Sequence, residues 1–251
     1  MVATVLNGFL NELITINTIP YPDGSMQVRP RAEISVLGYQ ENRVAPALDG
    51  PLGGKVMVNL PELAANPVNI EMRNAKEVDE LGRVVEIPMP FSIWVLPKTA
   101  GGTPMCAALQ RAGELADQWA RSHPGNYPPV VVNVTDGAST DGDPTALAHA
   151  LGQISTVDGQ ALLYNVHITE HNLPPVEYPV SEAELPNDEF ARLLFSISSP
   201  IPETSRTLLE TVAGRRVSPG ARGLIFNGDA ASIQQMFTFA SAPAKATNPN
   251  M

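Results

Sequence analysis

Hydrophobic residues recur at helical spacing over the first part of the chain and at other spacings after it. The opening stretch VATVLNGFLNELITI has apolar residues three and four positions apart, which predicts an amphipathic helix beginning at residue 1. RAEISVLGYQ alternates between apolar and polar residues and predicts one strand, whereas LPELAANP predicts a short helical turn. Alternation returns between Asn69 and Leu96 around a central Leu-Gly and predicts a hairpin, whose second strand is confined to an edge by Pro88 and Pro90.

Strand and helix patterns alternate through the second half of the chain. A helix follows GGTP, with Thr103 as its N-cap and Pro104 in its first turn, and the strand Val130–Val134 comes next. DPTALAHALGQIS predicts a helix capped by Asp143, and QALLYNVHIT predicts a strand apolar enough for burial on both faces. The remaining predicted elements are the helices NDEFARLLFSIS and PETSRTLLETVAG, the strand ARGLIFNG and the closing helix DAASIQQMFTF.

This alternation predicts an α/β fold, in which a doubly wound, mostly parallel sheet carries helices on both faces. Ligands of such sheets gather at the carboxyl ends of the strands. We expect one domain over residues 1–240, with a β-hairpin inserted at about 69–97. Residues 241–251 should form a flexible tail, because they have no large apolar side chain before Met251.

Composition narrows the functions that this chain can have. The chain has a net charge of −10 and contains no cluster of lysine or arginine. Both features argue against nucleic acid as a partner. The single cysteine, Cys106, cannot form an intramolecular disulfide or a thiolate metal cage, which fits a reducing compartment. The apolar runs are too short to span a membrane, and the start lacks a basic segment and a cleavage pattern. We therefore expect a soluble, cytoplasmic protein.

Aspartates, glycines and hydroxyl residues follow the valine-rich strand in VVVNVTDGASTDGD, residues 130–143. Mg²⁺ prefers carboxylate and hydroxyl oxygens and keeps several waters, so Asp136 at the strand end is well placed as a ligand. An EF-hand calcium loop is not predicted, because Ala138 or Ala146 stands where that loop needs a ligand or a glycine. DGPLGGKV lacks the first glycine of a P-loop and the hydroxyl residue after Lys55, so it does not predict nucleotide binding.

A catalytic nucleophile is the alternative interpretation of the same stretch. Ser139 lies between a strand and a helix, as the serine of a nucleophile elbow does, but the motif ends in Asp141 rather than in glycine. In that fold the acid and the histidine follow the serine along the chain, which leaves Asp158 with His167 or His171. A serine hydrolase using Ser139 stays open as the rival hypothesis.

Two stretches together carry a family resemblance. GGTPM opens an amphipathic helix at residues 101–105, and the buried strand that follows it ends in TDG at residues 135–137. This pair resembles the second half of a von Willebrand factor A domain. The layout over roughly residues 1–240, with EISVLGY as the second strand and LLYNVHIT as the fifth, is similar to bacterial, intracellular members.

The resemblance implies a doubly wound sheet with a metal-ion-dependent adhesion site at its top. In that family the site draws on three loops: an Asp-x-Ser-x-Ser motif after the first strand, a threonine before a later helix, and an aspartate after the fourth strand. Thr103 matches the threonine and Asp136 matches the aspartate. The resemblance therefore implies Mg²⁺ as the ion and another protein as the ligand, through an acidic residue that completes the metal site.

The chain departs from the family because it contains no Asp-x-Ser-x-Ser motif. PDGSMQ has a similar Gly-Ser-Met, but it lies after the first predicted helix and does not take that role. The family's first strand and its motif would have preceded Met1. Either the true start lies upstream, which we favour, or the second and fourth strands close the gap, or a partner donates a strand. Thr103, Asp136 and waters alone should bind Mg²⁺ poorly.

The leading hypothesis is a non-enzymatic protein-interaction module whose binding face carries Thr103 and Asp136, with or without Mg²⁺. A metal-free scaffold that binds by shape alone is a further alternative. We expect Asp141 and Asp143 to be turn and cap residues, and His167 to be a satisfied polar group at a strand end. Cys106 should be an inert packing thiol.

Overall fold

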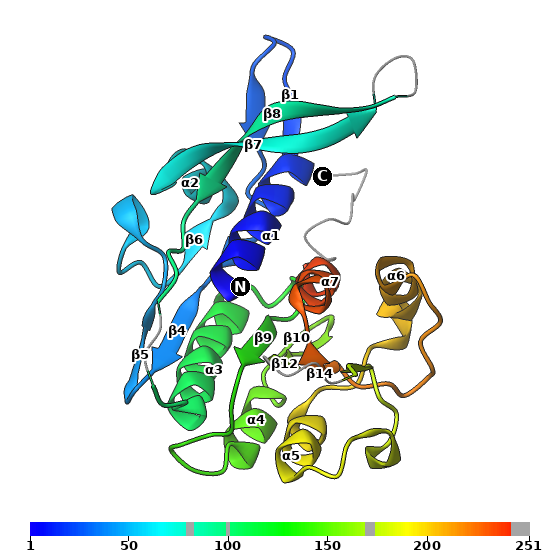
Figure 1. The fold of residues 1–251 in the computed structure, drawn as a ribbon. Helices are drawn as coiled ribbons and strands as arrows, with labels where there is room; N and C mark the ends of the chain where they lie inside the picture. Colours follow the sequence, from blue (N-terminus) through cyan, green and yellow to red (C-terminus); the bar gives the residue numbers. More distant parts are fainter. Residues whose placement is uncertain (79–82, 99–100, 169–173, 242–251) are drawn as a thin grey trace. The chain divides into compact units, whose positions relative to one another are not determined.

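The computed structural model describes residues 1–78, 83–98, 101–168 and 174–241. These residues form a mixed α/β structure with seven α-helices and several small sheets, one of which has four strands (Figure 1). The predicted α/β class is thereby confirmed. By its internal contacts the chain divides into two compact units, chiefly residues 3–36 with 46–98 and residues 37–45 with 99–251.

The first unit contains two α-helices, one 3-10 helix and three small antiparallel strand pairs among its described residues. Its elements are α1 (Val2–Ile16), β1 (Thr18–Pro20), β2 (Met26–Val28), β3 (Glu33–Ile34), the 3-10 helix η1 (Gly50–Leu52), β6 (Val58–Asn59), α2 (Leu60–Ala65), β7 (Asn69–Val78) and β8 (Val84–Ile93). The strand pairs are β1 with β2, β3 with β6, and β7 with β8. The predicted first helix and the helical turn at LPELAANP are both confirmed.

Two asparagines attach α1 to the end of β8 and the residues that follow it. The Asn7 amide donates to the Val95 carbonyl (2.8 Å), and its oxygen accepts the N–H groups of Trp94 (2.9 Å) and Val95 (3.1 Å). One turn later, Asn11 makes the same pair of bonds with Ser92 (2.7 and 3.0 Å). Side-chain amides thus take the place of a neighbouring strand, which explains how a buried polar residue such as Asn7 is tolerated in an apolar helix face.

The predicted hairpin is confirmed as β7 and β8, which pair antiparallel over ten residues each. The Leu-Gly expected at its turn lies outside the described residues. Pro88 and Pro90 both lie in β8, which has no other strand beside it in the described structure, as the edge prediction requires.

The prediction of one strand over RAEISVLGYQ is wrong. The stretch is split into β3 and β4 (Leu37–Gln40), and these pair with different partners, β6 and β5 (Arg43–Pro46). The Val36 carbonyl accepts the Ala47 N–H (2.8 Å) between the two short strands, so the chain changes partner there. Period-two alternation continues through such a change, because it records which faces are buried and not which strand is next to them.

The second unit is built on a four-stranded mixed sheet in the order β13-β14-β12-β9. The strands are β9 (Val130–Thr135), β12 (Leu162–Ile168), β13 (Val176–Glu177) and β14 (Leu224–Gly228). β9, β12 and β14 run parallel, and the short β13 runs antiparallel to β14. The three parallel strands are those that the sequence predicts, while the doubly wound arrangement of the whole chain stays a prediction.

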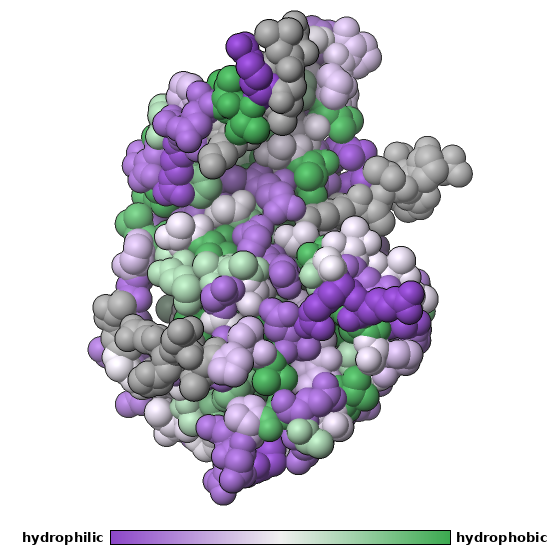
Figure 2. All heavy atoms as spheres, turned by 45° about the vertical axis from the view of Figure 1, so that its right-hand side comes forward, coloured by the Kyte–Doolittle hydropathy of each residue, from purple (hydrophilic) through white to green (hydrophobic). Residues whose placement is uncertain are grey.

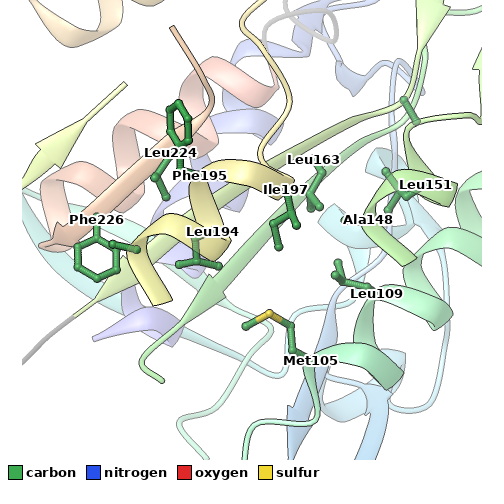
Figure 3. Packing of buried hydrophobic residues seen from close by; sticks show 12 residues of the cluster. Met105, Leu109, Ala148, Leu151, Leu163, Leu194, Phe195, Ile197, Leu224 and Phe226 are labelled. Atoms are coloured by element: carbon green, nitrogen blue, oxygen red, sulfur yellow. The ribbon is translucent and has the colours of Figure 1, made fainter. Parts of the chain in front are cut away.

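Helices pack against both faces of this sheet. They are α3 (Met105–Ser122), α4 (Thr145–Leu151), α5 (Glu189–Ile197) and α7 (Ala230–Ala240), while α6 (Glu203–Ala213) packs against α7. Figure 3 shows side chains of α3, α4 and α5 pointing toward Leu163 of β12 and Leu224 and Phe226 of β14. On the other face, the Tyr164 ring stacks on Phe239 of α7, with ring centroids 5.6 Å apart. Neighbouring residues of β12 therefore serve two different cores, as burial on both faces requires.

Smaller elements complete the second unit: β4 with β5, the pair β10 (Ser155–Thr156) and β11 (Gly159–Gln160), and the 3-10 helix η2 (Glu182–Glu184). On the face drawn in Figure 2, hydrophobic residues are scattered among hydrophilic ones. No helix among the described residues is both long and apolar enough to cross a bilayer. Residues 242–251, the predicted tail, lie outside the described part of the chain.

Candidate functional site

The loop after β9 and the segment before α3 are held together at the carboxyl end of β9. The Thr103 N–H donates to the Thr140 hydroxyl (3.0 Å), and the Thr140 N–H donates to the Thr103 carbonyl (2.9 Å). A side-chain carbon built on Gly137 would lie 3.5 Å from the Thr103 hydroxyl oxygen. The structure therefore brings Thr103 beside the Asp136-Gly137 turn, although these positions are far apart in sequence.

The expectation that Thr103 caps α3, with Pro104 in the first turn, is wrong. The helix begins at Met105, and Pro104 takes the N-cap position without a side-chain hydrogen bond. Asp141 caps the helix from the β9 loop, with one carboxylate oxygen accepting the Cys106 N–H and the other the Ala107 N–H, both at 2.9 Å. A bidentate carboxylate satisfies two unpaired helix N–H groups and carries the charge that a helix N-terminus favours.

The Thr103 hydroxyl is left without a hydrogen bond to any described residue, because Asp141 takes over the capping. Asp136 is exposed, and its carboxylate likewise makes no hydrogen bond within the described ranges. Together they offer a hydroxyl and a carboxylate oxygen, the donor types that Mg²⁺ accepts. In the described part of the chain, no three His, Cys, Asp or Glu side chains cluster as a metal site would require. The residues fit an ion that takes its remaining ligands from water or a partner.

Asp141 also accepts a hydrogen bond from the Ser139 hydroxyl (2.9 Å), whose oxygen lies 3.8 Å from the Cys106 sulfur. Partial desolvation raises the pKa of Asp141, but the N–H groups of Ala107 and Cys106 outweigh it, so the net pKa is lowered. Burial raises the pKa of the Cys106 thiol, and the nearby carboxylate of Asp141 adds to that effect. The thiol is therefore protonated at neutral pH, as an inert packing cysteine should be.

Asp143 turns the chain into α4. Its carboxylate accepts the Thr145 N–H (2.9 Å) and the Thr145 hydroxyl (2.6 Å). The N-cap position is Pro144, one residue after Asp143, so the prediction that Asp143 is the N-cap of α4 is wrong. The turn role expected for Asp143 is confirmed, and its carboxylate is already engaged in two hydrogen bonds with Thr145.

His167, at the end of β12, is enclosed by aromatic rings. It stacks on Phe226 with centroids 4.2 Å apart and meets Phe190 edge-on at 5.6 Å. Its Nδ1 accepts the Asn227 N–H (3.4 Å), which confirms the expectation of a satisfied polar group. Burial lowers the pKa of His167, although the negative charges of Asp188 and Asp136 act in the opposite direction.

No described histidine is hydrogen-bonded to Ser139, whose hydroxyl donates to Asp141 instead. His171, the other candidate base, lies outside the described residues.

Beside the β9 loop, Ala138 shares a shallow 440 Å³ hollow with Asp188, Glu189, Phe190 and Leu193 of the α5 region.

A tyrosine that sequence analysis did not single out lies next to the site. The Tyr39 hydroxyl, from β4, lies 2.7 Å from the Asn133 side-chain oxygen and 3.0 Å from the Val134 carbonyl oxygen of β9, so these two acceptors share its single proton. Burial raises the pKa of Tyr39 to about 12; a hydrogen bond to Thr135 lowers it, and the charge of Asp136 raises it. Neither Tyr39 nor the capping role of Asp141 has a local sequence signal, because both act on partners distant in the chain.

A buried polar row continues from Asn133 across the sheet. The Asn133 amide donates to Asn165 of β12 (2.9 Å), and the Asn165 amide donates to the Ser198 hydroxyl (2.9 Å). Ser198 in turn donates to the Leu194 carbonyl of α5 (2.7 Å). Together with Tyr39, this row links β4, β9, β12 and α5 beneath the candidate site.

Gly102 sets the path of the chain into Thr103. Its φ of +81° suits glycine, and a side-chain carbon there would lie 2.8 Å from the Glu41 carbonyl oxygen. The Glu41 N–H also donates to the Gly101 carbonyl. The GGT sequence thus has a packing reason, since only glycine allows this close approach of two backbone segments.

The chain matches no protein-family model, no curated protein and no solved structure.

Proposed function

We propose that this protein is an interaction module of von Willebrand A type, whose binding face is formed by Thr103 and Asp136. The observation that carries the proposal is the contrast between loop side chains that are hydrogen-bonded within the protein and those that are not. Asp141, Thr140 and Asp143 make the structural hydrogen bonds, while the Thr103 hydroxyl and the Asp136 carboxylate stay available at the end of β9. Oxygen atoms that lie at the end of a strand and make no hydrogen bond within the described residues are available to bind a ligand.

The ligand we propose is an acidic side chain of a partner protein, bridged by Mg²⁺. Two protein oxygens leave most of the octahedral coordination of Mg²⁺ open, so the ion alone should bind weakly. A carboxylate from the partner would add a third oxygen ligand, and the Mg²⁺ between the two carboxylates would offset their mutual repulsion. The metal-free alternative, recognition by shape, predicts binding that does not depend on the ion.

Hydrolysis at Ser139 is less well supported by the geometry. A serine nucleophile needs a base within hydrogen-bond reach. The Ser139 hydroxyl instead donates a hydrogen bond to Asp141, whose carboxylate also caps α3. Loss of a measurable esterase activity in Ser139→Ala, with only a partial loss in Asp136→Asn, would favour the hydrolase over the interaction module.

A titration with a glutamate-containing hexapeptide, with 5 mM Mg²⁺ or with EDTA, tests the proposal by calorimetry. We expect peptide binding in Mg²⁺ that falls about tenfold or more in Asp136→Asn and in Thr103→Val, because each removes an ion ligand. EDTA should abolish binding to the unmodified chain. Mg²⁺ without peptide should give little heat.

Asp143→Asn is the matched control, because it removes a neighbouring carboxylate that is used in a turn rather than at the face. It should bind the peptide like the unmodified chain. Equal affinity in Mg²⁺ and EDTA would support the metal-free scaffold, and an unchanged affinity in Asp136→Asn would overturn the assignment of this face.

A further inference from the structure

The two outer edges of the β7–β8 hairpin are protected to different degrees. The edge of β8 carries Pro88 and Pro90, and Asn11 of α1 binds the backbone of Ser92 near its end. β7 contains no proline, and no other described strand pairs with it on the side away from β8. Proline and covering side chains are means by which proteins block an edge strand. β7 is therefore the side on which this hairpin can accept another strand.

The pairing of the hairpin identifies the backbone groups of β7 that point to this open edge. Ser92 directs its N–H and carbonyl groups away from β7, because Asn11 binds both (3.0 and 2.7 Å). Directly opposite residues of an antiparallel pair both point inward or both point outward, and Ile70 is opposite Ser92. Ile70, Met72 and Asn74 therefore direct their N–H and carbonyl groups outward. Among the described residues, no hydrogen bond reaches these backbone groups.

The side chains along this edge restrict which strand can pair with it. Ile70 and Met72, on one face of the hairpin, are 57% and 65% exposed. Glu71 and Arg73 lie on the other face as a half-exposed ion pair, with 2.8 Å between nitrogen and oxygen. Charges on an edge discourage pairing with most strands, and like charges directly opposite one another are unfavourable. A partner strand must therefore present opposite charges at the same spacing.

β7 of a second copy of this chain meets that requirement. When two β7 strands run antiparallel with Met72 opposite Met72, Glu71 of each copy lies opposite Arg73 of the other, on the same face of the sheet. Ile70 then lies opposite Asn74, and each facing pair of outward residues exchanges both of its N–H···O bonds. Sliding the strands by two residues in either direction sets Glu71 opposite Glu71 or Arg73 opposite Arg73. The charges thus favour one register over its neighbours.

We propose that this chain forms a symmetric dimer in which two β7 strands pair edge to edge, giving a four-stranded sheet in the order β8-β7-β7-β8. A surface that complements itself in this way is what a two-fold interface needs. A two-stranded hairpin is only marginally stable alone, and four strands remove that weakness. So short a ladder buries less than the about 1,600 Å² of a standard interface, so we expect a Kd on the order of 10–100 μM. The dimer is independent of the face formed by Thr103 and Asp136.

Sedimentation equilibrium of the full chain at about 5 to 500 μM, a range that brackets such a Kd, tests the dimer. Glu71→Arg and Arg73→Glu each set like charges opposite one another. Each variant alone should therefore dimerise about tenfold more weakly or worse than the unmodified chain. An equimolar mixture of the two variants has opposite charges in both facing pairs, and it should associate like the unmodified chain.

Arg111→Glu is the matched control, because it changes the net charge by the same amount as Arg73→Glu and breaks a similarly exposed ion pair, with Glu114 of α3. It should leave the association unchanged. A chain that stays monomeric at every concentration would overturn the proposal. A mixture that associates no better than its two components, or an equal loss in Arg111→Glu, would do the same.

Cysteine cross-linking tests the register. Met72→Cys, in a chain whose own thiol is removed by Cys106→Ala, places two thiols across the symmetry axis. Directly opposite residues have Cα atoms about 5.5 Å apart, within the span of a disulfide. Ile70→Cys is the control on the same exposed face, because its two copies would lie four residues apart, about 13 Å. Air oxidation should yield at least about tenfold more disulfide-linked dimer from Met72→Cys. Equal yields from the two variants would contradict this pairing.

Discussion

Asp141 carries more of the local structure than its exposed position suggests. Its two oxygens accept the first free N–H groups of α3, and the same carboxylate holds the Ser139 hydroxyl. Asp141→Asn keeps the size of the side chain but can serve fewer of these donors and lacks the charge that favours a helix N-terminus. We expect a loss of about 1 kcal/mol in the free energy of unfolding at pH 7, measured by urea titration.

The pH dependence of the same variant provides a second check. The folded-state pKa of Asp141 is lowered, so its contribution is present above the ordinary carboxyl pKa and is lost as the pH falls through the depressed value. The difference between Asp141→Asn and the unmodified chain should therefore shrink in acid. Asp117→Asn, which removes an exposed carboxylate paired with Arg121 on the same helix, should change stability by less than about 0.5 kcal/mol. A loss in that control as large as in Asp141→Asn would contradict a specific capping role.

At the scale of elements, the half-buried Tyr39 and the buried Tyr178 allow one substitution to be compared in two environments. The single proton of the Tyr39 hydroxyl is shared between two acceptors of β9, whereas the Tyr178 hydroxyl is buried without a partner among the described residues. Tyr39→Phe should lower the free energy of unfolding by about 1 kcal/mol, because it frees β4 from β9. Tyr178→Phe should leave stability unchanged or raise it by a similar amount, because it removes an unsatisfied group.

Chemical denaturation of both variants under identical conditions measures this difference. Each change deletes one oxygen from a tyrosine, so packing and hydrophobicity alter almost equally in the two. Equal effects would mean that the Tyr39 hydroxyl does not anchor β4, and a larger loss in Tyr178→Phe would point to a partner that the described residues do not supply.

Elements with a strong internal pattern could be predicted from the sequence, and those defined by their partners could not. The strands β9, β12 and β14 and the helices of the second half follow from unbroken apolar runs and from 3.6-residue periodicity. RAEISVLGYQ failed because alternation does not reveal a change of partner at Val36. At the candidate site, Thr103 and Asp136 rest on a motif that resembles a family, and their role stays a prediction. The cap by Asp141 and the contact from Tyr39 depend on tertiary proximity that no local pattern contains.

At the scale of the whole molecule, His167 should make stability depend on pH in the weakly acidic range. Its folded-state pKa is lowered by burial, so the unfolded chain binds the proton more readily. Its contribution is fully present above the unfolded pKa of about 6.5 and declines as the pH falls below that value. Because the ring is half-buried, we expect a decline of less than about 1 kcal/mol.

His167→Phe should reduce this pH dependence, since a phenyl ring can keep the stacking on Phe226 without titrating. Thermal unfolding between pH 7.5 and 5 measures the slope in both proteins. The same slope in His167→Phe and the unmodified chain would assign the titration to another group.

The hydrogen bonds of the Asn7 and Asn11 side-chain amides, which hold α1 in place, also constrain the order in which this chain can fold. Asn7 and Asn11 find their partners 81 to 88 residues further along, at Ser92, Trp94 and Val95. Contacts of such long sequence separation form slowly, because the intervening loop must be closed before they contribute any stability. During synthesis, α1 is made before β8 and keeps an apolar face uncovered until the end of β8 has followed it. This helix is therefore secured late relative to its own synthesis, and the growing chain is open to chaperones and to aggregation in that interval.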